Sequence, residues 1–316
     1  EDEARVFMQY ARAAFCTQSH LERWDCGEMC ELAPAAQGGV RFLGRGSRWE
    51  EQGFVAKQPG NPSEGLGITR CVVSFRGSID FMNWVSDGEF WTSPWPNWEG
   101  ASGASWCPNC GVHHGFAAVY KELRMQMLAA IRELGCNQLA FTGHSAGAAL
   151  ATLASLEARA SLGLHVDRVW AFGKPRVGDR SFVRAYVAAA RVQNVHPPMW
   201  RVVHYHDPVP RLPPNGPVTW MFGYVHEPQE VYYTARDSSS RRICASSSEH
   251  PESHDSTCAW GTDIVDCLAH PQFDHCTYLN MTTLKDHLPP ACTIDEAASQ
   301  VFSPPPMASS RRLLVV

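Results

Sequence analysis

The stretch Leu-Ala-Phe-Thr-Gly-His-Ser-Ala-Gly, residues 139–147, decides the fold. Leu139–Phe141 is an apolar run long enough for a buried strand, and the alanine- and leucine-rich run 146–157 favours a helix. Between them, Gly-x-Ser-x-Gly places Ser145 at a sharp turn from strand to helix, which directs its hydroxyl outward. We predict that Ser145 is a nucleophile and that the Ala146 N–H, at the helix N-terminus, faces an oxyanion. The pentapeptide alone is a weak signal, since glycine and serine are common in turns.

Strands and helices alternate on both sides of this stretch. Apolar runs predict strands at 70–75, 166–172, 199–205 and 230–234, with a short edge strand at 53–57. Apolar residues at helical spacing predict helices at 3–15, 115–134 and 181–190. This order predicts an α/β fold with a mainly parallel central sheet and helices on both faces.

Composition limits the function classes. The chain has 316 residues, 44% hydrophobic and 19% charged, which is typical of a globular protein. The net charge of −5 argues against a nucleic-acid partner, and no apolar run is long enough for a transmembrane segment. Twelve cysteines favour a secreted protein whose signal peptide has been removed. Asn280-Met281-Thr282 is a glycosylation sequon, which can also arise by chance.

A serine nucleophile needs a histidine base and a carboxylate that orients it, in the order serine, acid, histidine for this kind of turn. Asp207 follows the predicted strand 199–205 directly, and Pro208 forces the chain to turn there. Asp167 and Asp179 are weaker candidates, because they flank a strand and a helix as surface residues do. The histidines after Asp207 are His226, His250, His254, His270, His275 and His287. Order alone does not choose among them.

Six linked motifs resemble one family. They are 75–78 (Phe-Arg-Gly-Ser) with Asn83-Trp84, 112–116 (Val-His-His-Gly-Phe), 141–151 around Ser145, 172–178 (Phe-Gly-Lys-Pro-Arg-Val-Gly), 204–214 around Asp207, and 223–226 (Gly-Tyr-Val-His). The chain resembles the fungal-type class 3 lipases, which include secreted triacylglycerol lipases and feruloyl esterases with the α/β-hydrolase fold. The match covers most of residues 1–292, so we expect one domain there and a flexible tail at 293–316.

The resemblance implies roles for particular residues. The family's catalytic histidine lies in an H-x-x-Y segment, which here is 275–278 and selects His275. His226 would have a structural role near the acid. Ser78 would complete the oxyanion hole beside Ala146 through its N–H and hydroxyl, and Asp87 would hold the Ser78 hydroxyl when a cover segment opens.

The cover segment would be 79–106, which holds five of the eleven tryptophans, among them Trp84. We expect a mobile lid whose apolar side can face lipid. The alternative is a fixed loop folded over a core. This range is richer in tryptophan and longer than the resemblance leads us to expect, so substrate choice is what the resemblance predicts least well.

The cysteines suggest several disulfide bonds. Cys107 and Cys110 lie in a Gly/Ser-rich loop, where a disulfide is favoured over a redox motif or a zinc site with His113 and His114. The resemblance suggests Cys26–Cys30 and Cys16–Cys292, and Cys258–Cys267 is plausible. The pairing of Cys71, Cys136, Cys244 and Cys276 stays open.

These observations predict a secreted, monomeric serine carboxylester hydrolase, of triacylglycerol lipase type, acting on lipid at an oil–water interface. Ser145, Asp207 and His275 would carry the chemistry without metal or organic cofactor. The rivals are a soluble esterase of feruloyl esterase type, a phospholipase A1, and a non-catalytic lipid-binding relative.

Overall fold

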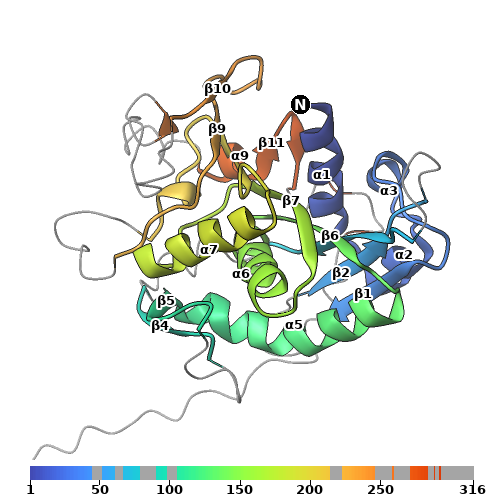
Figure 1. Ribbon diagram of the computed structural model, residues 1–316. Coiled ribbons are helices and arrows are strands. Elements are labelled where there is room, and N and C mark those ends of the chain that lie inside the picture. The colour runs from blue at the N-terminus through green and yellow to red at the C-terminus, as the bar shows by residue number, and fades with distance from the viewer. Residues whose placement is uncertain are drawn as a thin grey trace, which may run out of the picture.

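The computed structural model describes residues 1–44, 52–60, 67–78, 90–97, 105–213, 223–245, 258–259, 271–283, 288 and 292. Its centre is an eight-stranded sheet in the order β1-β2-β3-β6-β7-β8-β9-β10 (Figure 1). These strands are β1 Val40–Gly44, β2 Gln52–Lys57, β3 Arg70–Phe75, β6 Gln138–His144, β7 His165–Phe172, β8 Trp200–His204, β9 Glu230–Tyr233 and β10 Arg241–Ile243. Strands β3, β6, β7, β8 and β9 pair in parallel, while β1, β2 and β10 are antiparallel additions at the edges. The predicted mainly parallel sheet is confirmed.

Helices cover both faces of the sheet. The four longer ones are α1 Asp2–Ala13, α5 His114–Glu133, α6 Ala146–Ala160 and α7 Arg180–Val192. Alternate residues of β6 point to opposite faces, so Leu139 and Phe141 pack with α5, α6 and α7, and Ala140 packs with α1. Figure 1 shows α1 set apart from the other three helices. This layering places the C-terminal ends of the parallel strands, where Ser145 lies, at one edge of the core.

Short elements complete the described chain. They are α2 Gln18–Arg23, α3 Glu28–Leu32, the 3-10 turn η1 Val209–Arg211, α9 Pro271–Cys276, and two hairpins, β4 Thr92–Trp95 with β5 Cys110–His113 and β11 Thr277–Tyr278 with β12 Met281–Thr282. Asn280 of the sequon is exposed in the two-residue turn of the second hairpin. No helix among these residues is long and apolar enough to cross a membrane.

The predicted cover 79–106 is only partly described. Trp84, Asp87 and the predicted tail 293–316 lie outside the described residues. Trp95 is 3% exposed on β4 and contacts Tyr120 of α5 at 5.5 Å between ring centroids. Trp95 therefore packs in the core beside α5. Trp91, just before β4, is 48% exposed.

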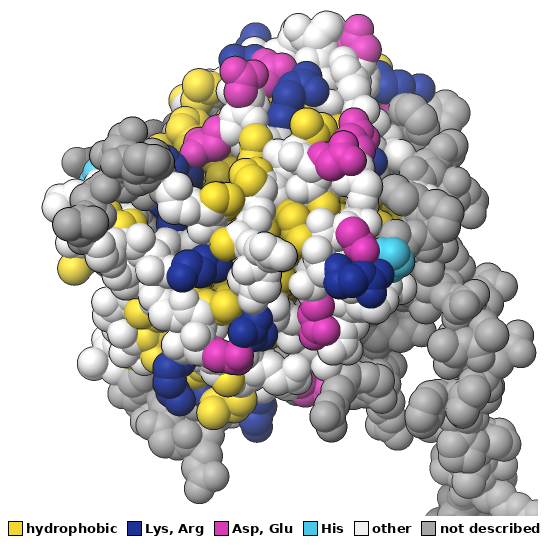
Figure 2. Space-filling view, turned by 90° about the vertical axis from the view of Figure 1, so that its right-hand side faces the viewer, with side chains coloured by type: hydrophobic (Ala, Val, Ile, Leu, Met, Phe, Trp, Pro, Cys, Tyr) yellow, Lys and Arg dark blue, Asp and Glu magenta, His cyan; other side chains and the backbone are white. Residues whose placement is uncertain are grey.

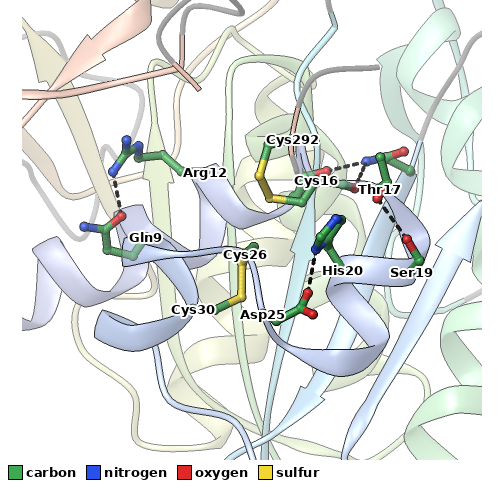
Figure 3. The surroundings of a disulfide bond; sticks show 12 residues. Gln9, Arg12, Cys16, Thr17, Ser19, His20, Asp25, Cys26, Cys30 and Cys292 are labelled. Atoms are coloured by element: carbon green, nitrogen blue, oxygen red, sulfur yellow. Dashed lines mark hydrogen bonds and ion pairs between the residues drawn. A yellow bond between two sulfur atoms is a disulfide. The ribbon is translucent and has the colours of Figure 1, made fainter. Parts of the chain in front are cut away.

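Five disulfides join the described chain, and three match expectation: Cys16–Cys292, Cys26–Cys30 and Cys107–Cys110. The first ties residue 292 to the chain just beyond α1 (Figure 3). Cys107–Cys110 leaves no thiolate for the zinc alternative. The structure also pairs Cys71 with Cys136.

The suggested pair Cys258–Cys267 is wrong, because Cys258 is bonded to Cys244. Glu230 brings these two together. Its carbonyl accepts from the Cys244 N–H at 3.0 Å, and its carboxylate accepts from the N–H of Ala259 at 3.1 Å. Cys267 lies outside the described residues, and Cys276 is a free thiol.

The surface beside α1 mixes both signs of charge. Figure 2 shows Lys and Arg side chains interspersed with Asp and Glu on the described part of this face, with apolar side chains between them. A nucleic-acid interface would gather basic side chains in one patch. The described part of this face offers no such patch.

Candidate active site

Ser145 sits at a tight turn between β6 and α6, as predicted. Its backbone has φ 57° and ψ −128°, a conformation that costs energy for a residue with a side chain. A Cβ on Gly143 would lie 2.4 Å from the backbone of Gly147, and a Cβ on Gly147 would lie 2.1 Å from the carbonyl oxygen of Phe75. Both glycines are therefore needed for α6 to pack closely against β3 and β6.

The structure brings Ser145, His275 and Asp207 together from three elements. The Ser145 Oγ lies 2.8 Å from His275 Nε2, and His275 Nδ1 lies 3.1 and 3.0 Å from the two Asp207 carboxylate oxygens. Because a carboxylate only accepts, Nδ1 carries the proton and Nε2 is free to accept from the serine hydroxyl. All three side chains are buried.

Asp207 is held by donors on both carboxylate oxygens. The Val209 N–H donates to Oδ1 at 2.8 Å, and the Tyr278 hydroxyl donates to Oδ2. Burial, together with the nearby Asp207 charge, raises the pKa of Tyr278 well above its usual value, so the hydroxyl remains a donor. Tyr278 lies in the H-x-x-Y segment, but nothing in that pattern indicates a contact with Asp207.

The loop that follows Asp207, residues 207–213 (the Asp207 loop), is anchored through its carbonyl groups. The His226 Nε2 lies 2.6 Å from Pro210 O, so His226 does lie against this loop. Arg176 donates to Arg211 O and, at 2.7 Å, to Pro213 O. Arg176 is 1% exposed, and burial lowers its pKa to about 9.

A fully buried ion pair lies beside this anchor. Lys174 Nζ is 2.6 Å from a carboxylate oxygen of Glu227, and both side chains are 0% exposed. Burial lowers the pKa of Lys174 to about 8, although Glu227 acts in the opposite direction. Neither charge can reach water, so each depends on the other, and the pair holds residues 174 and 227 together.

The segment around His275, residues 274–283 (the His275 segment), is also held by its carbonyl groups. His204 Nδ1 lies 2.9 Å from Asp274 O, and His144 Nε2 lies 2.7 Å from His275 O. From α1, Arg5 donates to Leu279 O at 3.0 Å and Arg12 to Thr282 O at 2.9 Å. The sequence did not single out His144 or Arg12, because their partners lie more than 130 residues away.

The two predicted oxyanion donors, Ala146 and Ser78, are both among the described residues. Ala146 begins α6, so its N–H is one of the unpaired groups of a helix N-terminus. A Cβ on Gly77 would lie 2.8 Å from His144 O and 3.2 Å from the Ser145 Cβ, so the chain just before Ser78 passes close to the serine turn. Ser78 itself is exposed.

Comparison with known proteins places the chain in a family. The model of the family "Lipase (class 3)" matches residues 72–216. A secreted mono- and diacylglycerol lipase A of Penicillium cyclopium is 30% identical over 245 residues, 74% of this chain and 70% of that protein. A secreted mono- and diacylglycerol lipase 1 of Fusarium solani is 28% identical over 239 residues, 72% of this chain and 62% of that protein.

The fold agrees with solved lipase structures. Lipase II from Rhizopus niveus superposes with a TM-score of 0.65 at 22% identity, over 89% of this chain and 94% of that chain. The chain spans about half to three fifths of the length of several curated relatives that it matches. The expected family and fold are both confirmed. The chain belongs to the class 3 lipase family and has the α/β-hydrolase fold.

Proposed function

We propose that the protein is a secreted serine carboxylester hydrolase that acts on acylglycerols, the triacylglycerol lipase type predicted above. The observation that carries this proposal is the chain of hydrogen bonds from Ser145 through His275 to Asp207. Membership of the class 3 lipase family supports the ester substrate, and the names of the Penicillium and Fusarium relatives support an acylglycerol and secretion.

The geometry supports an acyl-enzyme mechanism. The Ser145 Oγ attacks the ester carbonyl carbon while its proton passes to His275 Nε2, and Asp207 stabilises the resulting imidazolium. The Ala146 and Ser78 N–H groups would bind the oxyanion, and losing one such donor costs about 3 kcal/mol of barrier. His275 then protonates the leaving alcohol. Water attacks the acyl-enzyme, gives its proton to His275, and releases the acid as Ser145 regains its proton.

The triad can be tested by substitution. Ser145→Ala, His275→Ala and Asp207→Ala should each lower kcat by about 10⁴-fold or more, and double variants should lose little beyond the worst single variant. Ser161→Ala and His165→Ala are matched controls, because both residues are exposed and outside the site. An organophosphonate should label Ser145 in the wild-type protein. An unlabelled Ser145 with full ester hydrolysis would contradict the proposal, and absence of both would favour the non-catalytic relative.

We also propose that the protein works at an oil–water interface. Trp91 is half exposed on the segment that leads into β4, and exposing a large indole to water costs about 25 cal/mol per Å² of apolar surface. Contact with lipid removes that cost, so an open state of the proposed cover, residues 79–106, would gain population there. Trp84 and Asp87 belong to this proposal as the lid residue and the partner of Ser78.

The interface test compares one short-chain ester below and above its solubility limit. Activity should rise sharply once the ester forms a separate phase, and Trp91→Ala should reduce that rise more than it reduces activity on dissolved ester. Emulsified triacylglycerol, phospholipid and a feruloyl ester, assayed side by side, separate the lipase from its two enzymatic rivals. Smooth saturation through the limit would mean that the cover is fixed and would favour the soluble esterase.

A further inference from the structure

We infer that His144 is a positioning residue for His275: its imidazole fixes the backbone of the proposed base relative to Ser145. This inference rests on the proposed function, because it gives His144 a role only if His275 acts on Ser145. His144 is 2% exposed at the end of β6, directly before Ser145. Its imidazole reaches the backbone of the proposed base.

The hydrogen bond defines the tautomer of His144. Its Nε2 lies 2.7 Å from the carbonyl oxygen of His275, and a carbonyl can only accept. The proton is therefore on Nε2. The other nitrogen, Nδ1, is buried and has no hydrogen-bond partner within the described part of the chain. A neutral imidazole that donates from Nε2 accounts for both observations.

The position of His144 makes this contact a direct link between nucleophile and base. His144 and Ser145 are neighbours in the chain, and His144 pairs with Phe172 in the parallel sheet, so its backbone is fixed by the core. His275 lies at the end of the short helix α9, 131 residues further along the chain. A shift of about 1 Å between reacting groups can cost about 10²-fold in rate. The hydrogen bond from His144 to His275 O holds the base at a fixed distance from Ser145, so we expect it to affect catalysis.

Two further groups fix the same place. His204 lies 2.9 Å from Asp274 O, so imidazoles of two histidines contact consecutive carbonyl groups at the base. The ring of Tyr278 lies edge-on to His144 at 5.6 Å between centroids. Because these contacts go to the backbone of His275 and to its flank, the ring of His275 keeps both nitrogens for Ser145 and Asp207.

The charge of His144 suits this role. The two histidine rings are 4.6 Å apart, and His275 becomes a cation during the proposed reaction. Burial, and then the neighbouring His275, lower the pKa of His144 well below its usual value. His144 therefore stays neutral and does not oppose the charge that forms on its neighbour. A lysine or arginine could donate to the same carbonyl but would add a repelling charge.

Substituting Asn or Gln for His144 distinguishes the effect of its hydrogen bond to His275 O from the effect of its packing. The Gln side-chain nitrogen is placed as far from the backbone as the histidine Nε2, whereas the Asn nitrogen corresponds to Nδ1 and is too short to reach His275 O. We expect His144→Asn to lower kcat on a dissolved p-nitrophenyl ester by about 10²-fold with KM within twofold, and His144→Gln to recover at least tenfold of that loss. His165→Asn is the control.

Two more measurements complete the test. The rate of organophosphonate labelling of Ser145 should fall with kcat in His144→Asn, because labelling also needs the base. Thermal unfolding identifies any variant that does not fold. If His144→Asn does not fold, kcat of the folded His144→Gln variant still tests the positioning role. Equal losses in a folded Gln and Asn variant, or a folded Asn variant with wild-type kcat, would overturn the positioning role. If the wild-type protein itself is neither labelled nor active, the proposed function fails instead.

Discussion

The Asp207 loop and the His275 segment reach Ser145 by the same device but with different chemistry. In both, side chains donate to backbone carbonyl groups. The Asp207 loop is held by Arg176 and His226 beside the fully buried Lys174–Glu227 pair. The His275 segment is held by His144 and, from α1, by Arg12 at the far end of the sequence.

The two regions therefore depend on different interactions for their structure. Buried charges are satisfied only in the folded core, so damage near the Asp207 loop should appear as lost stability. The His275 segment lies near the end of the described chain and depends on contacts with α1 and on the Cys16–Cys292 bond. There, we expect loss of the disulfide to lower stability, and loss of the contacts to the backbone of His275 to lower activity.

Removing Cys16–Cys292 should give the largest effect. This bond closes a loop with a sequence separation of 276, for which chain entropy predicts a contribution of about 5 kcal/mol to the free energy of unfolding. Cys16→Ala with Cys292→Ala should lower the urea midpoint accordingly. Cys26→Ala with Cys30→Ala, which opens a loop with a separation of only 4, is the control and should cost less. Equal losses would show that chain restraint is not what this bond supplies.

Breaking the Lys174–Glu227 pair should come next. Glu227→Leu leaves a buried ammonium without its partner, which costs about 3–5 kcal/mol. The double variant Lys174→Met with Glu227→Leu removes both charges and should recover most of that loss. Arg23→Ala, in an exposed pair with Asp25, should leave the urea midpoint unchanged. A double variant as unstable as Glu227→Leu would mean that the site depends on shape, with charge pairing secondary.

The regular elements could be predicted because their signals are local. The helix expected at 115–134 is α5 at His114–Glu133, and the strand expected at 166–172 is β7 at His165–Phe172. The turn at Ser145 could also be predicted, since glycine at 143 and 147 is what close packing of α6 requires. In each case the residues that form the element also determine it.

What could not be predicted depends on residues far apart in the chain. The Cys244–Cys258 bond joins two segments that both form hydrogen bonds with Glu230, and the spacing of the cysteines does not indicate this contact. His144 stands next to the predicted nucleophile, but its partner is the carbonyl of residue 275. Strand β4 was hidden in a range read as cover, because its pairing with β5 and its packing on α5 decide its structure.

The smallest expected effect is on the pH dependence of stability, because a buried histidine with a lowered pKa contacts each region: His144 the His275 segment and His226 the Asp207 loop. Burial lowers the pKa of both His144 and His226 well below the usual value near 6.5. His144 also faces His275, and His226 faces the cations Arg201, Lys174 and Arg176, which act in the same direction. As pH falls below about 6.5, the unfolded chain takes up a proton at each position and the folded chain does not. Their contribution to stability is complete above that pH and is lost as pH falls.

Each histidine should therefore add about 1.4 kcal/mol per pH unit to the slope of the unfolding free energy below pH 6.5. Urea unfolding at several pH values between about 7.5 and 5 measures this slope. His226→Gln and His144→Gln should each lower this slope by about 1.4 kcal/mol per pH unit, whatever their effect on stability at neutral pH. Only the His144 variant should also change the acid limb of the kcat/KM profile, because only His144 faces the ring that carries the proposed proton. Equal pH–rate profiles for the two variants would remove the distinction between the regions.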